Sequence, residues 1–444
     1  MIHLMVAHTP DHLIAPDGAT NDLFGSAIGI SETRLMVGAP SHSADQYLGG
    51  AAYAFEFDGF AWQMNQKINP PSPDAYGEFG CAIDIDGDTA AVGWMGAMEG
   101  DDRIGKVAIY TWANGIWKLH QLIHDPIAEH GDRFGVSVDL DDDHLIIGCQ
   151  LDDEVASNAG SALIYQRSDD VWTFQSRLLP SQADAGSWAG RDVKIDGDLA
   201  VIGAYKEWNG DLQSAGAAYV FRHHPETGWS EETRLVASDA HAGDYFGFSV
   251  SVNQGRIAVG SILNDAPHED SGAVYLFEIK DSQWHQQKIP PPDVGGEFGY
   301  GIELQGPDLY VGSVYHPGPG FATGAVYRFE ILNDQSHWKG KWLPKAGADD
   351  CFYGASIVKD SGLVCIGSPR EDTNGSWSGA AYIHLSSHLC EADLNDDVRI
   401  DVNDLLILIS DWGSCESCDA DVNDDGQVGT DDLLHVLERW GWCQ

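Results

Sequence analysis

Side-chain oxygens recur at alternate positions of a twelve-residue stretch near the C-terminus. Its first, third, fifth and twelfth positions hold Asp421, Asn423, Asp425 and Asp432. Gly426 stands at the sixth position, and Gln427 at the seventh offers a backbone carbonyl. A hard cation such as Ca²⁺ takes about six to eight oxygen ligands, and this spacing turns alternate residues toward the centre of a loop. The stretch therefore predicts a calcium site.

An earlier stretch repeats this pattern, with Asp393 in the place of Asp421 and Asp404 in the place of Asp432. Its ligand side chains would be Asp393, Asn395, Asp397, Asp401 and Asp404. The sixth position is Val398, where the turn prefers glycine, so we expect this loop to be strained or to bind more weakly. Each loop precedes a short apolar segment that contains a Leu-Leu pair. Two Ca²⁺ sites in a small helical domain, residues 390–444, are therefore expected.

Four cysteines flank these two loops, which suggests disulfide bonds in this domain. Two pairings respect the internal duplication. One joins Cys390 to Cys443 and Cys415 to Cys418; the other joins Cys390 to Cys415 and Cys418 to Cys443. The first is favoured because the end of one helix should lie near the start of the other loop, but the sequence leaves both open.

The duplicated loop-helix segment resembles a dockerin domain of type I, which is built like half of an EF-hand. The resemblance implies docking to a cohesin-like or cell-surface protein. In that family the tenth and eleventh loop positions contact the partner, often as Ser or Thr. Here these positions hold Val402, Asn403, Thr430 and Asp431. We therefore do not expect ordinary cohesin specificity.

The rest of the chain repeats one hairpin seven times, each copy with a glycine near both ends. The pairs are Gly25/Gly38, Gly80/Gly93, Gly135/Gly148, Gly190/Gly203, Gly247/Gly260, Gly299/Gly312 and Gly354/Gly367. The separation within a pair is the same in all seven copies, and the first glycines follow one another at nearly constant intervals. Such a period indicates a repeat architecture.

Each hairpin is followed by a third strand that opens with Gly, and six are followed by a fourth strand led by Trp. The seventh hairpin lacks that fourth strand. We expect Ile2 to Ala7 to supply it and so to cover the exposed edge of the last sheet. The predicted fold is mainly β: a seven-bladed β-propeller of four-stranded blades over residues 1–389, its N-terminal strand completing the last blade.

The Phe-Gly opening, the Val37-Gly38-Ala39 type of close and the Gly-Ala-Tyr strand resemble FG-GAP repeats, which build integrin-alpha-like propellers. Blades of that type often carry a long Asp-rich calcium loop between the first two strands. Here the position holds short turns such as Asp86-Gly87-Asp88, because Asp-Gly tolerates the positive φ of a tight hairpin turn. We therefore interpret these residues as turns.

Variable loops on the repeated scaffold are the natural place for a ligand surface, which could take a carbohydrate or a protein. Candidate binding aromatics on these loops are Tyr47, Trp94, Tyr205, Trp208, Tyr315 and Trp377. Recognisable catalytic motifs are missing, and no catalytic residue is assigned. We expect a non-catalytic binding or scaffold protein. The alternative is a carbohydrate-active enzyme, a glycoside hydrolase or lyase of polysaccharides with its active site in the propeller channel.

The net charge of −45 argues against binding to nucleic acid or to anionic lipid. No apolar run approaches the ~20 residues needed for a transmembrane helix. The protein is expected outside the cell or at the cell surface. The first residues lack the features of an export signal, so this location requires a mis-called gene start, a truncated chain or another export route.

Overall fold

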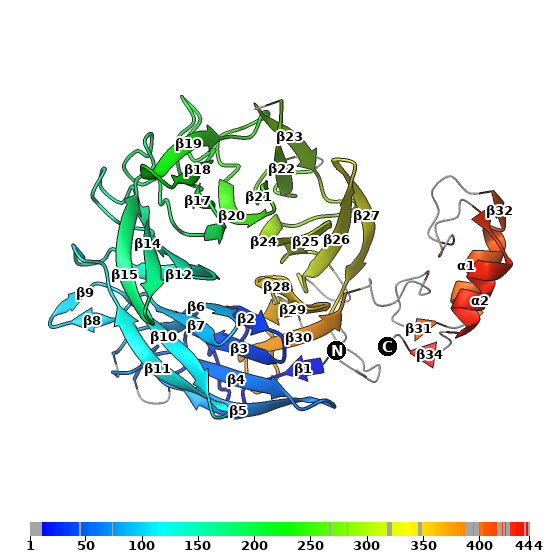
Figure 1. Ribbon diagram of the computed structural model, residues 1–444, viewed down its shortest axis with the longest axis horizontal. Helices are drawn as coiled ribbons and strands as arrows, with labels where there is room; N and C mark the ends of the chain where they lie inside the picture. Colours follow the sequence, from blue (N-terminus) through cyan, green and yellow to red (C-terminus); the bar gives the residue numbers. More distant parts are fainter. Residues whose placement is uncertain are drawn as a thin grey trace.

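The computed structural model describes residues 11–43, 46–72, 74–265, 268–281, 283–317, 322–344, 349–386, 394, 399–400, 402–414, 420, 422, 427–438 and 441–442. Within these residues, seven four-stranded antiparallel sheets stand around a central channel (Figure 1). The first strand of each sheet lies at the channel and the fourth at the periphery, so the predicted seven-bladed propeller is confirmed.

The blades follow one another along the chain. Blade 1 is β2 (Ile28–Ser31), β3 (Arg34–Ala39), β4 (Ala51–Phe57) and β5 (Trp62–Ile68). Blade 2 is β6 (Phe79–Asp86), β7 (Thr89–Trp94), β10 (Lys106–Ala113) and β11 (Ile116–Ile123), with the small hairpin β8 (Met98–Glu99) and β9 (Asp102–Arg103). Blade 3 is β12 (Phe134–Asp141), β13 (His144–Cys149), β14 (Ser161–Ser168) and β15 (Val171–Leu178).

The remaining blades have the same strand order. Blade 4 is β16 (Val193–Asp196), β17 (Leu199–Ala204), β18 (Ala217–His224) and β19 (Gly228–Leu235). Blade 5 is β20 (Phe246–Asn253), β21 (Arg256–Ser261), β22 (Ala273–Lys280) and β23 (Gln283–Ile289). Blade 6 is β24 (Phe298–Gln305), β25 (Asp308–Ser313), β26 (Ala325–Leu332) and β27 (Gln335–Trp342). Blade 7 is β28 (Ile357–Asp360), β29 (Leu363–Ser368), β30 (Ala380–Leu385) and β1 (Asp11–Leu13).

An N-terminal strand closes the ring, as predicted, but it is not the segment that we expected. β1 pairs antiparallel with β30, with Leu13 opposite Ala381. The expected Ile2 to Ala7 lies outside the described residues. The physical reason is the length of the connection from a fourth strand to the next blade. The number of residues from Leu13 to Phe24 equals the number from Ile68 to Phe79. The closing strand must end where every other fourth strand ends.

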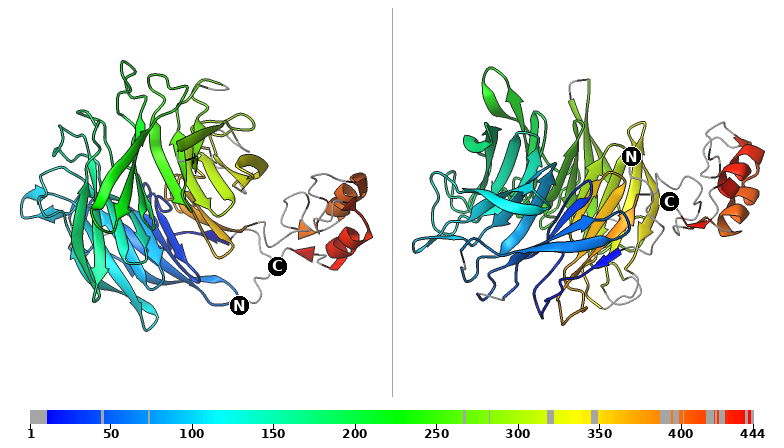
Figure 2. Two further views of the ribbon diagram at one scale, coloured as in Figure 1. Left: turned by 45° about the horizontal axis from the view of Figure 1, so that its top comes forward. Right: turned by 60° about the horizontal axis from the view of Figure 1, so that its bottom comes forward.

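The apolar cores lie between neighbouring blades. One core packs Leu35, Val37 and Phe55 of blade 1 against Cys365 and Ile383 of blade 7. A repeat of this size cannot bury both faces of its own sheet, so each blade depends on its two neighbours. Figure 2 shows this stacking of sheets around the ring from two further directions.

The paired glycines allow the inner ends of neighbouring blades to touch. A Cβ atom on Gly38 would lie 2.0 Å from the carbonyl oxygen of Gly80 in the next blade. Corresponding distances of 2.0 to 2.3 Å occur at Gly93–Gly135, Gly148–Gly190, Gly203–Gly247, Gly260–Gly299, Gly312–Gly354 and Gly367–Gly25. The second glycine of each repeat is therefore required by the first glycine of the next repeat.

Side chains at one repeat position join the hairpin turns around the ring. The Asp86 carboxylate accepts the backbone N–H of Asp142 at 2.9 Å, and the Asp196 carboxylate accepts that of Gln254 at 2.6 Å. The seven linking residues are Ser31, Asp86, Asp141, Asp196, Asn253, Gln305 and Asp360. Gln305 differs from the others in donating from its amide to a backbone carbonyl. The acidic turns thus act as structural links.

The C-terminal segment contains α1 (Val402–Ser410) and α2 (Thr430–Glu438). Two short strand pairs accompany them: β31 (Arg399–Ile400) with β34 (Gly441–Trp442), and β32 (Gly413–Ser414) with β33 (Gln427–Val428). Leu408 and Val436 are buried between the two halves. The predicted boundary at 389/390 and the four flanking cysteines lie outside the described residues. No helix in the described part of the chain is long and apolar enough to cross a membrane.

Candidate ligand site at the mouth of the channel

The residue before each inner-strand opening has a left-handed backbone conformation. Its φ lies between 54° and 59° at Leu23, Glu78, Arg133, Trp188, Tyr245, Glu297 and Phe352. Hydrogen bonds to the preceding blade hold this geometry; the N–H of Trp188, for example, donates to the Asn158 carbonyl at 3.2 Å. Bulky residues seldom adopt positive φ, and such strain is concentrated at functional sites.

A cavity of about 570 Å³ occupies the end of the channel beside these residues. Three arginines and several aromatic side chains line it, among them Arg133, Arg191, Arg370, Trp188, Tyr205 and Phe352. All seven blades contribute to its wall. This volume falls within the usual range of small-ligand pockets, roughly 300–1,000 Å³. The arrangement can therefore hold an organic ligand at the hub of the propeller.

Two of the arginines are held in place by aromatic rings. The Arg191 guanidinium carbon lies 3.7 Å from the centroid of the Phe248 ring, and its Nη1 donates to the Phe248 carbonyl at 3.2 Å. The Arg370 guanidinium lies 3.6 Å from the Phe352 ring centroid and also pairs with Asp350 at 3.3 Å. Stacking of this kind restricts the rotamers of a long side chain and fixes the direction of its N–H donors.

The other end of the channel holds a cavity of about 290 Å³ with acidic walls. Lys194 pairs there with Asp139, with 2.7 Å between Nζ and Oδ1. Burial, reinforced by the nearby Asp139 carboxylate, raises the pKa of Asp84 to about 7. Burial also raises the pKa of Glu303 to about 8. Both groups therefore change charge near neutral pH, which suits proton transfer as well as electrostatic binding.

Sequence reasoning assigned no catalytic residue and missed this group of carboxylates. A signal was available at the fourth residue after the first glycine of each repeat. That position reads Gly29, Asp84, Asp139, Lys194, Ser251, Glu303 and Val358. Alignment of the seven hairpins would have shown that one position carries most of the charge.

The predicted aromatic residues divide into two groups. Tyr205 lines the mouth cavity. Tyr315 packs edge-on against Phe352, with 4.9 Å between ring centroids, and the Arg370 guanidinium lies 4.9 Å from the Trp377 ring. These three aromatics therefore lie at or next to the mouth.

The other three do not share one surface feature with them. Trp94 belongs to β7 and is only 1 % exposed, packed against Phe79 inside the blade, so its expected place on a loop rim is wrong. The second strand of blade 2, β7, extends as far as Trp94, and its indole ring therefore packs into the core. Tyr47 is 61 % exposed and contacts Tyr76, while Trp208 is 47 % exposed.

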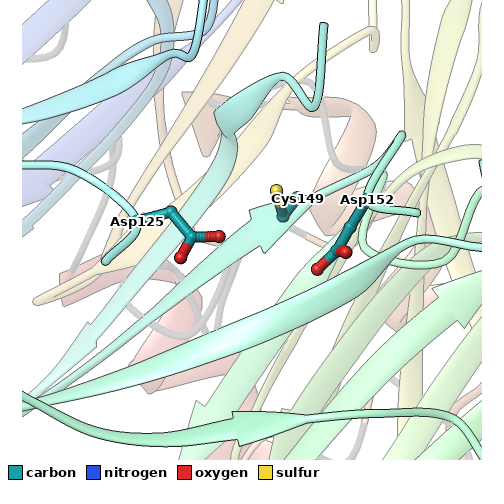
Figure 3. A group of neighbouring side chains, drawn as sticks. All are labelled: Asp125, Cys149 and Asp152. Atoms are coloured by element: carbon teal, nitrogen blue, oxygen red, sulfur yellow. The ribbon is translucent and has the colours of Figure 1, made fainter. Parts of the chain in front are cut away.

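A second group of potential ligand atoms lies in blade 3 and in the segment that leads into it from blade 2 (Figure 3). Oxygens of Asp125 and Asp152 and the Cys149 sulfur lie within 4.8 Å of one another, all buried. Arg177 neutralises both carboxylates; its Nη2 lies 2.5 Å from Asp125, and its Nη1 donates to Asp152. Ser161 also donates to Asp152. The guanidinium takes the position that a cation would need, so this group is structural.

Three of the predicted calcium ligands lie in the described part of the C-terminal segment. Asp404 and Asp432 occupy equivalent places in the duplication and are 0 % and 1 % exposed. Asp404 accepts the Leu394 N–H at 2.8 Å, and Asp432 accepts the Gly429 N–H at 2.7 Å. Gln427 lies in β33. The other predicted ligands lie outside the described residues: Asp393, Asn395, Asp397, Asp401, Asp421, Asn423 and Asp425.

The chemistry of these residues fits a calcium site, since buried carboxylates need compensating donors or a metal ion. Asp404 and Asp432 would contribute the charged oxygens at the end of each loop. The predicted partner-binding residues open the two helices and are exposed: Val402, Asn403, Thr430 and Asp431.

The geometry defines a seven-bladed β-propeller with a cavity at its hub that arginine and aromatic side chains line. A profile of the FG-GAP repeat matches residues 10–55, 117–165, 172–221 and 229–277, so the propeller contains FG-GAP repeats in these segments. A search of curated proteins found no matching sequence. Among solved structures, the chain is similar to a provisionally assigned 6-phosphogluconolactonase from Bacteroides uniformis, with 12 % identity over 78 % of this chain and 94 % of that one, and a TM-score of 0.47.

Proposed function

We propose that this protein is a non-catalytic binding or scaffold protein whose ligand site is the cavity at the channel mouth. The observation that carries the proposal is the convergence of arginine and aromatic side chains from different blades on one 570 Å³ space. The segments that lead into the inner strands supply Arg133, Trp188, Arg191 and Phe352, and the segments that follow the second strands supply Tyr205 and Arg370. The ligand would be a carbohydrate or a protein segment.

A binding screen tests this proposal directly. The full chain is applied to saccharide and peptide arrays, together with a Trp188→Ala variant and a Phe60→Ala control. Phe60 is 83 % exposed at an outer hairpin turn, so its loss removes aromatic surface away from the cavity. Ligands captured by the parent and the control should be lost with Trp188→Ala. Equal capture by all three proteins would exclude the mouth as the site.

We further propose that the C-terminal segment binds two Ca²⁺ ions, docks to a cohesin-like or cell-surface partner, and places the propeller outside the cell. The two equivalent buried carboxylates, Asp404 and Asp432, support the metal assignment. The exposed positions at the start of each helix support a docking face. Cohesin-like proteins immobilised on a resin should retain the full chain when calcium is present. Addition of a chelator should release it.

A second function, polysaccharide cleavage in the channel, is favoured by one specific observation. Asp84 and Glu303 have pKa values of about 7 and about 8, while Asp139 is paired with Lys194. Glycoside hydrolysis uses a protonated acid together with an ionised carboxylate. Turnover on acidic and neutral polysaccharides that disappears in Glu303→Gln would establish this activity in place of pure binding.

A further inference from the structure

Within the described part of the chain, the basic side chains that lack a carboxylate partner gather at the channel mouth. Of the 24 Lys and Arg residues, sixteen form an ion pair and three have side chains outside the described ones. The five that remain are Arg103, Lys118, Arg133, Arg191 and Lys206. Among them, Arg133 and Arg191 line the mouth cavity.

Lys206 belongs to the same group. Its Nζ lies 3.2 Å from the centroid of the Trp188 ring, which itself lines the cavity. Arg103 is different, because it donates to the backbone carbonyls of Tyr76, Gly96 and Ala75. Two cations that pair with no carboxylate among the described residues therefore line this cavity, and a third lies against the Trp188 ring in its wall.

This pattern is unusual for a chain with 69 Asp and Glu residues. Most cations elsewhere in the described propeller pair with a carboxylate, whereas Arg191 and Lys206 lie against aromatic rings and Arg133 is exposed. A local positive site inside a negative molecule attracts anions over about one Debye length, roughly 8–10 Å at physiological salt. Asp84 and Asp192 also line the cavity, but burial raises the pKa of both carboxyl groups and so disfavours their charged forms. The cations therefore favour a ligand that brings its own negative charge.

The wall between the cations is rich in hydroxyl groups. Ser137, Ser249 and Ser356 line the cavity, and each hydroxyl donates to the carbonyl of a glycine in the next blade. Each oxygen keeps lone pairs that can accept a hydrogen bond from a ligand hydroxyl. The amide of Gln150 adds both donor and acceptor capacity. A ligand with many hydroxyl groups fits this wall better than a peptide does.

We propose that the mouth cavity binds a saccharide that carries carboxylate or sulfate groups. Guanidinium groups recognise both groups through paired, charge-assisted hydrogen bonds, and the aromatic rings between them offer faces for a sugar ring. The inference rests on the proposed binding function and specifies the class of ligand. It assigns anion recognition to Arg133 and Arg191, with Lys206 as a third positive group.

Calorimetric titration of the full chain tests the inference with four probes. These are an oligouronate, a sulfated oligosaccharide, a neutral oligosaccharide of equal length and oligoglutamate. Arg133→Gln and Arg191→Gln should each weaken binding of the acidic saccharide by about tenfold or more, as expected for loss of a charged hydrogen-bond donor. Lys118→Gln removes the same charge from an exposed position on β11 and should leave affinity unchanged.

The outcomes separate this inference from the proposed function. Preference for the oligouronate or the sulfated probe supports the inference and shows which anionic group is bound. Equal binding of the neutral saccharide, still sensitive to Trp188→Ala, would refute anion recognition but keep the mouth as a binding site. Tighter binding of oligoglutamate would overturn the saccharide assignment. Acidic-saccharide binding that survives both arginine variants would refute the site.

Discussion

Gly367 of the last blade faces the carbonyl oxygen of Gly25 in the first blade, and a Cβ atom on Gly367 would lie 2.0 Å from that oxygen. The Ser356 hydroxyl donates to the same oxygen at 2.9 Å. The glycine contact joins the two ends of the propeller sequence and repeats the junction found between all other blades. The ring therefore closes through the same backbone contact that joins its consecutive blades.

Gly367→Ala should destabilise the propeller, because the new methyl group must displace backbone rather than a flexible side chain. We expect a loss of about 2–4 kcal/mol in the free energy of unfolding, measured by urea denaturation. Gly59→Ala is the control; its Cβ meets nothing within 4 Å, although its φ of 96° adds some strain. Similar losses in the two variants would contradict the packing argument.

Removal of residues 1–13 should open the ring, because β30 loses its partner β1. An unpaired edge strand favours association with another chain, so light scattering should detect dimers or larger species and the Tm should fall. A chain that lacks only residues 1–8 keeps the whole of β1 and serves as the control. If the longer truncation remains monomeric with an unchanged Tm, β1 does not close the propeller.

Arg177→Met should cost about 3–5 kcal/mol, because it leaves Asp125 and Asp152 buried without their common cation. Arg222→Met provides a comparison, since its partners Asp198 and Glu232 are both exposed and surface ion pairs contribute little. Urea denaturation of both variants measures the difference. A loss at Arg177 no greater than that at Arg222 would show that the blade 3 cluster is not structural.

Stability should depend on pH through the channel carboxylates. The folded-state pKa of Glu303, about 8, lies above its ordinary value because of burial. Its stabilising contribution is therefore fully present below the ordinary pKa and is lost as pH rises through about 8. A shift of this size makes the free energy of unfolding fall by roughly 4 kcal/mol between about pH 5 and pH 8.5, and Glu303→Gln should remove most of that fall. Parallel pH profiles for variant and parent in denaturant titrations would rule out this assignment.

If the proposed Ca²⁺ sites are correct, calcium should stabilise the C-terminal segment, because it would bind the folded loops and not the unfolded chain. Calcium at about 100 times its Kd would contribute about 3 kcal/mol, which EDTA should remove. Limited proteolysis and thermal melting of the full chain measure the change. Asp432→Ala should abolish the calcium response of its loop, whereas Asp431→Ala changes an adjacent exposed carboxylate. An unchanged melting curve after chelation would disprove the metal assignment.

Much of the fold could be predicted because its determinants are local and repeated. The constant spacing of the paired glycines marks each hairpin, and Trp62 and its equivalents mark the fourth strands. The missing seventh fourth strand indicated closure by the N-terminus. The spacing in the other blades also predicts where this strand ends, since the number of residues from Leu13 to Phe24 equals the number from Ile68 to Phe79.

The candidate site was harder to predict because its residues come from different repeats. Arg133 and Arg191 belong to successive copies of the repeat, and neither is part of a recognisable motif. Asp84, Asp139 and Glu303 likewise look isolated along the chain. Trp94 resembles a loop aromatic in the sequence, but its strand extends further than expected and buries it.

The sequence by itself determined the number of blades, their strand order and the two C-terminal helices, because backbone spacing and glycine placement act over short distances. Only the tertiary structure decided which side chains share the channel. Closure of the ring brings equivalent positions from all seven repeats to one axis. A charged side chain in one repeat therefore lies close to charged side chains from other repeats. Burial there then shifts the pKa values of Asp84 and Glu303, which their local sequence does not indicate.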